Sequence, residues 1–131
     1  MASIFIVDDS ETVREKLKTV LSEEGHEVTE AMNGSHALKK LSTNASKIDL
    51  MIVDVNMPVM GGLDFIEATS KNSTYKNIPV IMLTTESHAK MVLRAKRTNV
   101  VRAWMIKPFE KDKLIPLVDK ILESEGQKAA S

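Results

Sequence analysis

Polar side chains follow four short apolar runs of this 131-residue sequence, at the points where predicted strands would end. They are Asp8 and Asp9, Asp54, Thr84 and Lys107. In a parallel sheet the carboxyl ends of all strands lie along one edge, and ligands of open α/β sheets bind at that edge. We therefore expect these five side chains to converge in space, although they are far apart in the sequence.

Three carboxylates at one site repel one another, because two unit charges about 4 Å apart interact by roughly 4 kcal/mol at an effective dielectric constant of about 20. A cation must compensate, and the candidates are Lys107 and a divalent ion. Carboxylate oxygens suit Mg²⁺, which often works beside a phosphoryl group. One of the carboxylates can then act as a nucleophile and form an aspartyl phosphate. Lys107 and Thr84 would each bind a phosphoryl oxygen.

A simpler explanation is structural. Acidic residues at strand ends also cap loops and helix amino termini, where the helix dipole favours negative charge. This explanation suffices for one aspartate, but it accounts poorly for three aspartates, a threonine and a lysine that all follow strands. We therefore favour a phosphoryl-transfer site.

Strand and helix patterns alternate along the chain and would position these side chains. The runs typical of strands cover residues 4–7, 26–31, 50–53, 80–83 and 104–106. Ser10 is suited to cap the first helix and Gly25 to end it. Strands joined by helices run parallel, and continuously apolar runs fit a sheet covered on both faces. The sequence predicts a doubly wound α/β fold in which the polar run 26–31 is an edge strand.

Composition is that of one ordinary globular domain, with 43% hydrophobic and 27% charged residues. The 18 basic and 18 acidic side chains cancel, which argues against a dedicated nucleic-acid binder. The sequence has no cysteine, no apolar run of bilayer length and no signal-peptide pattern. We predict a cytoplasmic protein that binds neither nucleic acid nor a membrane.

Four segments resemble the receiver domains of two-component response regulators, most closely the stand-alone chemotaxis regulators of the CheY type. They read IVDDSE, MIVDVNMPVMGG, PVIMLTTES and WMIKPF, in the family's order and spacing. The resemblance implies a flavodoxin-like fold with five parallel strands in the order 2-1-3-4-5 and five helices. It implies a receiver domain over residues 1–124 and a polar tail over 125–131.

The resemblance also implies a metal site. Asp54 matches the phosphoacceptor, and Asp9 matches the acid that binds Mg²⁺ directly. Asp8 matches its neighbour, which acts largely through water, and Asn56 would offer its backbone carbonyl to the metal.

Other matches concern switching and dephosphorylation. Thr84 resembles the switch hydroxyl, and Lys107 the lysine that pairs with the phosphoryl group. Trp104 stands at the aromatic switch position, whose ring moves inward in relatives when the threonine is drawn to the phosphoryl group. Asn56 and Glu86 occupy the two variable positions that tune dephosphorylation in the family.

Several positions bear on how closely the chain follows its relatives. The Lys107–Pro108 peptide bond is expected to be cis, as in the family. Asn99-Val100 replaces a common Gly-Ala pair, and asparagine tolerates the left-handed conformation. Thr85 stands where alanine is common and would narrow access to the site. Pro116 falls inside the last predicted helix, so we expect that helix to start late or to kink.

The implied reaction transfers a phosphoryl group from a histidine kinase's phosphohistidine to Asp54, and self-catalysed hydrolysis follows. The protein would thus be a phosphoacceptor and not a turnover enzyme. No output domain follows the receiver, so we expect a monomer that signals by binding another protein. The favoured target is the flagellar motor switch protein, in control of flagellar rotation, with a phosphatase as a further partner.

Two other functions are compatible with parts of the pattern. A phosphorelay intermediate or phosphate sink would pass the group to a His-containing phosphotransferase. A hydrolase of the haloacid-dehalogenase type would also use an aspartyl nucleophile, but it carries a second Asp two residues later. Here that position is Asn56, and the chain has no cap domain for substrates.

Basic residues recur at helical spacing on the predicted fourth helix, about residues 87–98. Lys90, Arg94 and Arg97, with Arg102 nearby, form either a solvated face or a contact surface for an acidic partner. Trp104 lies either at the edge of a partner groove or half-buried in the core.

Overall fold

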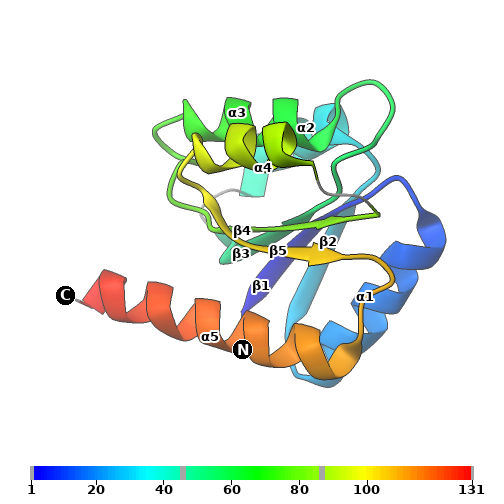
Figure 1. Ribbon diagram of the computed structural model, residues 1–131. Helices are drawn as coiled ribbons and strands as arrows, with labels where there is room; N and C mark the ends of the chain where they lie inside the picture. The colour runs from blue at the N-terminus through cyan, green and yellow to red at the C-terminus, as the bar shows by residue number, and fades with distance from the viewer. Residues whose placement is uncertain (1, 45–46, 86–87, 131) are drawn as a thin grey trace.

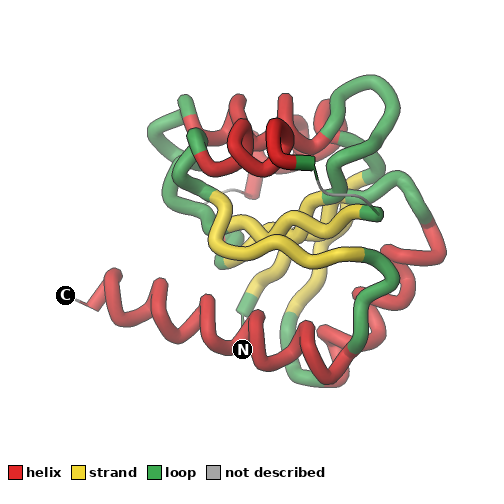
Figure 2. The backbone as a smooth tube through the Cα atoms, viewed as in Figure 1, coloured by secondary structure: helices red, strands yellow, loops and turns green. Residues whose placement is uncertain are grey.

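The computed structural model describes residues 2–44, 47–85 and 88–130, in which five strands alternate with five helices (Figures 1 and 2). The elements are β1 (Ser3–Val7), α1 (Glu11–Glu23), β2 (Glu27–Ala31), α2 (Gly34–Asn44), β3 (Leu50–Val53), α3 (Gly62–Ser70), β4 (Val80–Thr84), α4 (Ala89–Lys96), β5 (Val101–Ile106) and α5 (Lys111–Ala130).

All five strands run parallel in one sheet of order β2-β1-β3-β4-β5, so the predicted fold class and strand order are confirmed. The polar strand β2 lies at an edge, as its sequence predicts. The chain moves from β1 to one side to form β2 and then to the other side to form β3. The carboxyl ends of β1 and β3 therefore meet at the switch point, where ligands of such sheets bind.

Helices cover both faces of the sheet: α2, α3 and α4 lie on one face, and α1 and α5 lie on the other (Figure 1). Successive side chains of a strand point to opposite faces, and β1 follows this rule. Phe5 and Val7 pack in the cluster beneath α2, α3 and α4. Ile4 and Ile6 pack in the cluster with α1 and α5. Apolar burial on both faces explains why β1, β3 and β4 read as continuous apolar runs.

Local signals set the ends of the elements as expected. The Ser10 hydroxyl accepts a hydrogen bond from the backbone N–H of Val13 (3.3 Å) and caps α1. Gly25 has a φ of 86° just beyond that helix. Asn99 has a φ of 61° after α4, as predicted for asparagine in place of glycine.

The start of α5 corrects one expectation. The helix does not start late: it begins at Lys111, and Pro116 is inside it. Proline has no N–H, so the Asp112 carbonyl lacks the usual partner four residues on. Pro116 and Asp112 are both exposed, so this carbonyl remains open to water. The helix continues through residues 125–130, the segment that the sequence placed in a polar tail.

None of the helices within the described ranges is both long enough and apolar enough to cross a bilayer.

Replacing Pro116 with alanine should stabilise the protein, because it restores a helical hydrogen bond at an exposed site. Alanine is favoured over proline inside a helix by about 3 kcal/mol, and the more flexible unfolded chain offsets about 1 kcal/mol. Urea denaturation should therefore give a gain of about 2 kcal/mol for Pro116→Ala. The control Lys120→Ala, also exposed on α5, should change stability by less than about 0.5 kcal/mol. Equal stability of Pro116→Ala and the wild type would contradict this account.

Candidate functional site

The loop after β1 holds the first two acids. The Asp8 backbone N–H donates to the Ala31 carbonyl (3.1 Å), which extends the pairing of β1 with β2 by one residue. Asp8 is only 2% exposed, and its Oδ1 accepts a hydrogen bond from the Ser10 backbone N–H (2.9 Å). Asp9, in contrast, is exposed. The pair thus consists of one buried and one solvent-facing carboxylate.

Asp54 follows β3 in the same way. Its backbone N–H donates to the Val7 carbonyl (2.9 Å), so the residue continues the β1–β3 ladder and is only 5% exposed. The start of α3 packs directly on it: a Cβ added at Gly62 would collide with the Asp54 carbonyl oxygen. Glycine is therefore required at this close approach.

The three acids converge as the sequence predicts. Carboxylate oxygens of Asp8, Asp9 and Asp54 lie within 4.8 Å of one another. Lys107 joins them, with its Nζ 2.7 Å from Asp8 Oδ2 and 3.5 Å from Asp54 Oδ2. The buried Asp8 Oδ2 makes no hydrogen bond of good geometry in the described structure, so its charge is met by this ion pair.

Burial makes the charged form of Asp54 unfavourable. Burial raises the pKa of Asp54 most, the charge on Asp8 adds to the rise and Lys107 opposes it, and together they bring the pKa from 3.8 to about 6. Near neutral pH the carboxyl group is therefore largely ionised, but at a free-energy cost. Proximity to a cation would relieve this cost.

The donor set fits a hard divalent cation. Three carboxylates offer oxygen ligands only, and one of them, Asp9, is open to solvent. Such a set matches Mg²⁺, which retains several waters when bound to proteins. Asn56 is exposed in the loop just after Asp54, where its backbone carbonyl was expected to serve the metal.

The switch residues lie on the neighbouring strands. Thr84 ends β4 and is fully buried, and its carbonyl accepts a hydrogen bond from the Lys107 backbone N–H (2.7 Å). The Lys107–Pro108 peptide bond is cis, as expected. Trp104 is half-buried and packs against the cluster beneath α4, while its indole Nε1 has no hydrogen-bond partner among the residues described.

The structure describes only one of the two positions predicted to tune dephosphorylation, Asn56, together with the nearby Thr85. Asn56 and Thr85 are exposed near the site. Glu86, the second predicted tuning residue, lies outside the described residues.

The loop that follows Asp54 contains a strained turn that the sequence does not reveal. Val59 has a φ of 68°, and the Met60 N–H donates to the Pro58 carbonyl two residues back (2.7 Å). This is a γ-turn of the rare, strained type, centred on a β-branched residue that disfavours positive φ. Val59 is 86% exposed, so no apolar packing compensates.

The basic face of α4 is partly occupied by a contact within the chain. Arg94 binds Glu67 of α3 through Nε (2.8 Å) and Nη2 (2.6 Å), and Asp64 through Nη2 (2.6 Å). The bidentate pair holds α4 against α3. Lys90 and Arg97 remain exposed.

One residue that contacts the site was not among the sequence predictions. Arg14 of α1 donates from Nη1 to the Asp8 backbone carbonyl (2.7 Å). In a single sequence a cation in an amphipathic helix is indistinguishable from a solvated one, so no local signal identifies this contact.

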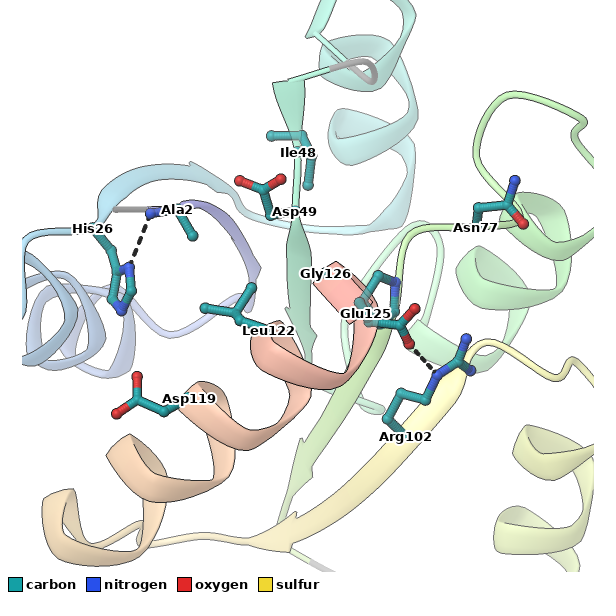
Figure 3. Close-up of a pocket in the computed structure, with 11 residues that line it drawn as sticks. Ala2, His26, Ile48, Asp49, Asn77, Arg102, Asp119, Leu122, Glu125 and Gly126 are labelled. Atoms are coloured by element: carbon teal, nitrogen blue, oxygen red, sulfur yellow. Dashed lines mark hydrogen bonds and ion pairs between the residues drawn. The ribbon is translucent and has the colours of Figure 1, made fainter. Parts of the chain in front are cut away.

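A wide groove of about 990 Å³ lies at the opposite, amino-terminal edge of the sheet (Figure 3). Its walls include Asp119 and Leu122 of α5, and the Arg102–Glu125 ion pair (2.7 Å) bridges β5 and α5 beside it. None of the predicted site residues lines this groove, so its size does not make it the chemical centre.

Comparison with known proteins agrees with this geometry. The family model of the response regulator receiver domain matches residues 4–119. The chain belongs to this family of receiver domains. It is 41% identical over 107 residues to the chemotaxis protein CheY1 of Helicobacter pylori, covering 81% of this chain and 85% of the relative. It is 34% identical over 121 residues to the chemotaxis protein CheY of Pseudomonas aeruginosa, covering 92% and 95%.

A solved relative has the same fold. The structure of chemotaxis response regulator CheY4 of Vibrio cholerae superposes with a TM-score of 0.83 at 36% identity, covering 92% of this chain and 98% of that one. The resemblance to the CheY-type regulators, noted from four sequence segments, is thereby confirmed.

The raised pKa of Asp54 predicts a pH-dependent effect on stability. Because the pKa of Asp54 is higher in the folded than in the unfolded state, ionisation of Asp54 lowers the free energy of unfolding. This loss of stability is absent below pH 4 and grows until the pH exceeds about 6. Without Mg²⁺, Asp54→Asn should thus be more stable than the wild type by about 2–3 kcal/mol above pH 6, with little difference near pH 4. Urea denaturation across this range measures both curves.

Asp119→Asn, on the exposed surface of α5, is the matched control and should follow the wild-type curve. Parallel curves for Asp54→Asn and the wild type would mean that Asp54 is not destabilised by its surroundings.

Proposed function

We propose that the protein is a phosphorylation-switched response regulator in which Asp54 accepts a phosphoryl group from a histidine kinase. The observation that carries this proposal is the convergence of three carboxylates and Lys107 at the switch point of the sheet. The family's domain is a signalling module, so the protein would act as a phosphoacceptor and not as a turnover enzyme.

The chain's own groups can perform the transfer by positioning and charge neutralisation. An Asp54 carboxylate oxygen attacks the phosphorus, the P–N bond to the donor imidazole breaks, and the imidazole leaves with its bonding electron pair. The Lys107 ammonium, now 3.5 Å from Asp54 Oδ2, would pair with the phosphoryl oxygens. The Asp54–phosphoryl bond is then lost by attack of water.

Asp8, Asp9, Asp54 and the Asn56 carbonyl would hold Mg²⁺. When bound there, the ion would supply positive charge that offsets the negative charge of the phosphoryl oxygens. Repulsion among the carboxylates of Asp8, Asp9 and Asp54 supports this metal assignment, because a bound cation would reduce it.

Thr84 and Trp104 would transmit the change. The Thr84 hydroxyl would hydrogen-bond a phosphoryl oxygen, which moves the end of β4 and changes the space available to Trp104 on β5. The indole N–H of Trp104 is buried and has no partner in the described parts of the chain, which supports a role as a mobile reporter. Asn56 and Glu86 would tune dephosphorylation.

The output would be binding of a flagellar motor switch protein by a monomer in the cytoplasm, in control of chemotaxis. Relatives at 34–41% identity are named chemotaxis proteins, which supports this process. A phosphatase would be a further partner.

The acceptor assignment is tested with acetyl phosphate as a small-molecule donor. In Mg²⁺ the wild type should gain one phosphoryl group, measured by intact-protein mass spectrometry, whereas Asp54→Ala should gain none. Asp119→Ala, which removes an exposed carboxylate of α5, should label as the wild type does. Labelling of Asp54→Ala at the wild-type level would overturn the site assignment.

The output assignment is tested by capture of flagellar switch protein. Wild-type protein with acetyl phosphate and Mg²⁺ should retain more switch protein than without the donor, and Asp54→Ala should show no such gain. Phosphorylation of the protein without a gain in capture would count against the motor switch protein as the target. The alternative partner is then a His-containing phosphotransferase, and transfer of the phosphoryl group to it would be measured.

A further inference from the structure

The Asp8–Asp9 peptide group is held from outside its own strand. Its carbonyl oxygen, on Asp8, accepts the hydrogen bond from Arg14 Nη1 at 2.7 Å. Among the described residues Arg14 is its only donor. The Asp8 N–H is bound by the Ala31 carbonyl of β2. Both polar backbone groups of Asp8 are thus restrained, one by β2 and one by α1.

Arg14 is itself held in place. Its Nε donates to Glu30 Oε1 at 2.9 Å, and its side chain is only 13% exposed. Glu30 also binds Lys18 Nζ through Oε2 at 2.7 Å, and its backbone carbonyl accepts a bond from Lys40 Nζ. Hydrogen bonds from Lys18 and Arg14 lower the pKa of Glu30, so it stays ionised and keeps the guanidinium oriented.

Asp9 depends on this restraint more than its neighbours do. Its carboxylate is exposed and makes no hydrogen bond or ion pair with another described residue, whereas Asp8 is fixed by Ser10 and Lys107. The direction of the Asp9 side chain therefore follows the orientation of the peptide group that precedes it. Arg14 binds the oxygen of that group.

We propose that Arg14 is a positioning residue for the cation site: through the Asp8 carbonyl it orients the backbone that aims the Asp9 carboxylate. This inference rests on the proposed Mg²⁺-dependent function. The charge of Arg14 does not oppose the cation strongly, because Glu30 is paired with it at 2.9 Å. A purely structural role, joining α1 to β2 through Glu30, is the alternative that the experiment must separate.

Lys18 provides the matched control. Lys18 and Arg14 both bind Glu30 and both join α1 to β2, but only Arg14 reaches the Asp8 carbonyl. If the connection between α1 and β2 alone matters, substitution of either residue should lower the affinity for Mg²⁺. If Arg14 positions the Asp9 carboxylate, only substitution of Arg14 should lower it.

The test is calorimetric titration of the whole chain with Mg²⁺ alone, together with thermal unfolding. Arg14→Ala should weaken Mg²⁺ binding by about tenfold, the lower end of the range for groups that orient metal ligands. Lys18→Ala should change the affinity by less than about twofold. Arg14→Lys, which keeps one donor for the Asp8 carbonyl, should bind more tightly than Arg14→Ala. Arg14→Met, which keeps an unbranched stem but has no donor, replaces Arg14→Ala if that variant does not fold.

Wild-type affinity in Arg14→Ala, or an equal loss in Lys18→Ala, would overturn the positioning role. If Arg14→Ala does not fold, wild-type affinity in Arg14→Met would overturn the positioning role in the same way. Absence of Mg²⁺ binding by the wild type would instead count against the proposed function itself.

Discussion

Repulsion among the carboxylates of Asp8, Asp9 and Asp54 is the constraint on which this edge of the molecule depends. Their oxygens lie within 4.8 Å because β1 and β3 are parallel neighbours that end at the same level. Lys107 reaches them from the end of β5, beyond β4, and its backbone N–H is bound to β4. The sheet order therefore brings together both the repelling carboxylates and the Lys107 ammonium that offsets their repulsion. A site balanced in this way can respond to a second cation or to an added phosphoryl group.

Several unfavourable features lie at or near the carboxyl edge of the sheet. Two apolar clusters bury the two faces of the sheet, and they require none of the site's charges. The edge carries a buried acid with a raised pKa and a positive φ at Val59. Two residues before the end of β5, the indole N–H of Trp104 has no partner among the described residues. Strained or unsatisfied groups of this kind persist where surrounding structure holds them, and they are common at functional sites. The apolar clusters thus stabilise one part of the domain, and the proposed phosphoryl-transfer site lies in another.

Local sequence signals predicted parallel strands and the convergence of Asp8, Asp9, Asp54 and Lys107, because these residues stand where apolar runs end. The order of the strands was predicted from the resemblance to receiver domains. The features that were missed depend on contacts between distant elements. The bond from Arg14 to the Asp8 carbonyl and the clamp of Arg94 on Glu67 require knowledge of how α1 and α4 are rotated about their axes. Val59 has a positive φ, which β-branched residues disfavour, so its residue type argues against the turn that the structure contains. Pro116 was expected to delay α5 or to kink it; the late start is wrong, because exposure of the affected carbonyl lets the helix begin at Lys111.

The most direct test of this account is the titration of the Asp54 carboxyl group, followed by NMR of its side-chain ¹³C signal and assigned with Asp54→Asn. Without metal, the midpoint should lie at about 6, because burial and Asp8 disfavour the charged form. Saturating Mg²⁺ should move the midpoint below that value, since the cation stabilises the carboxylate. An ordinary midpoint near 4 that Mg²⁺ does not move would contradict the central claim that this edge holds a destabilised charge cluster poised to bind a cation.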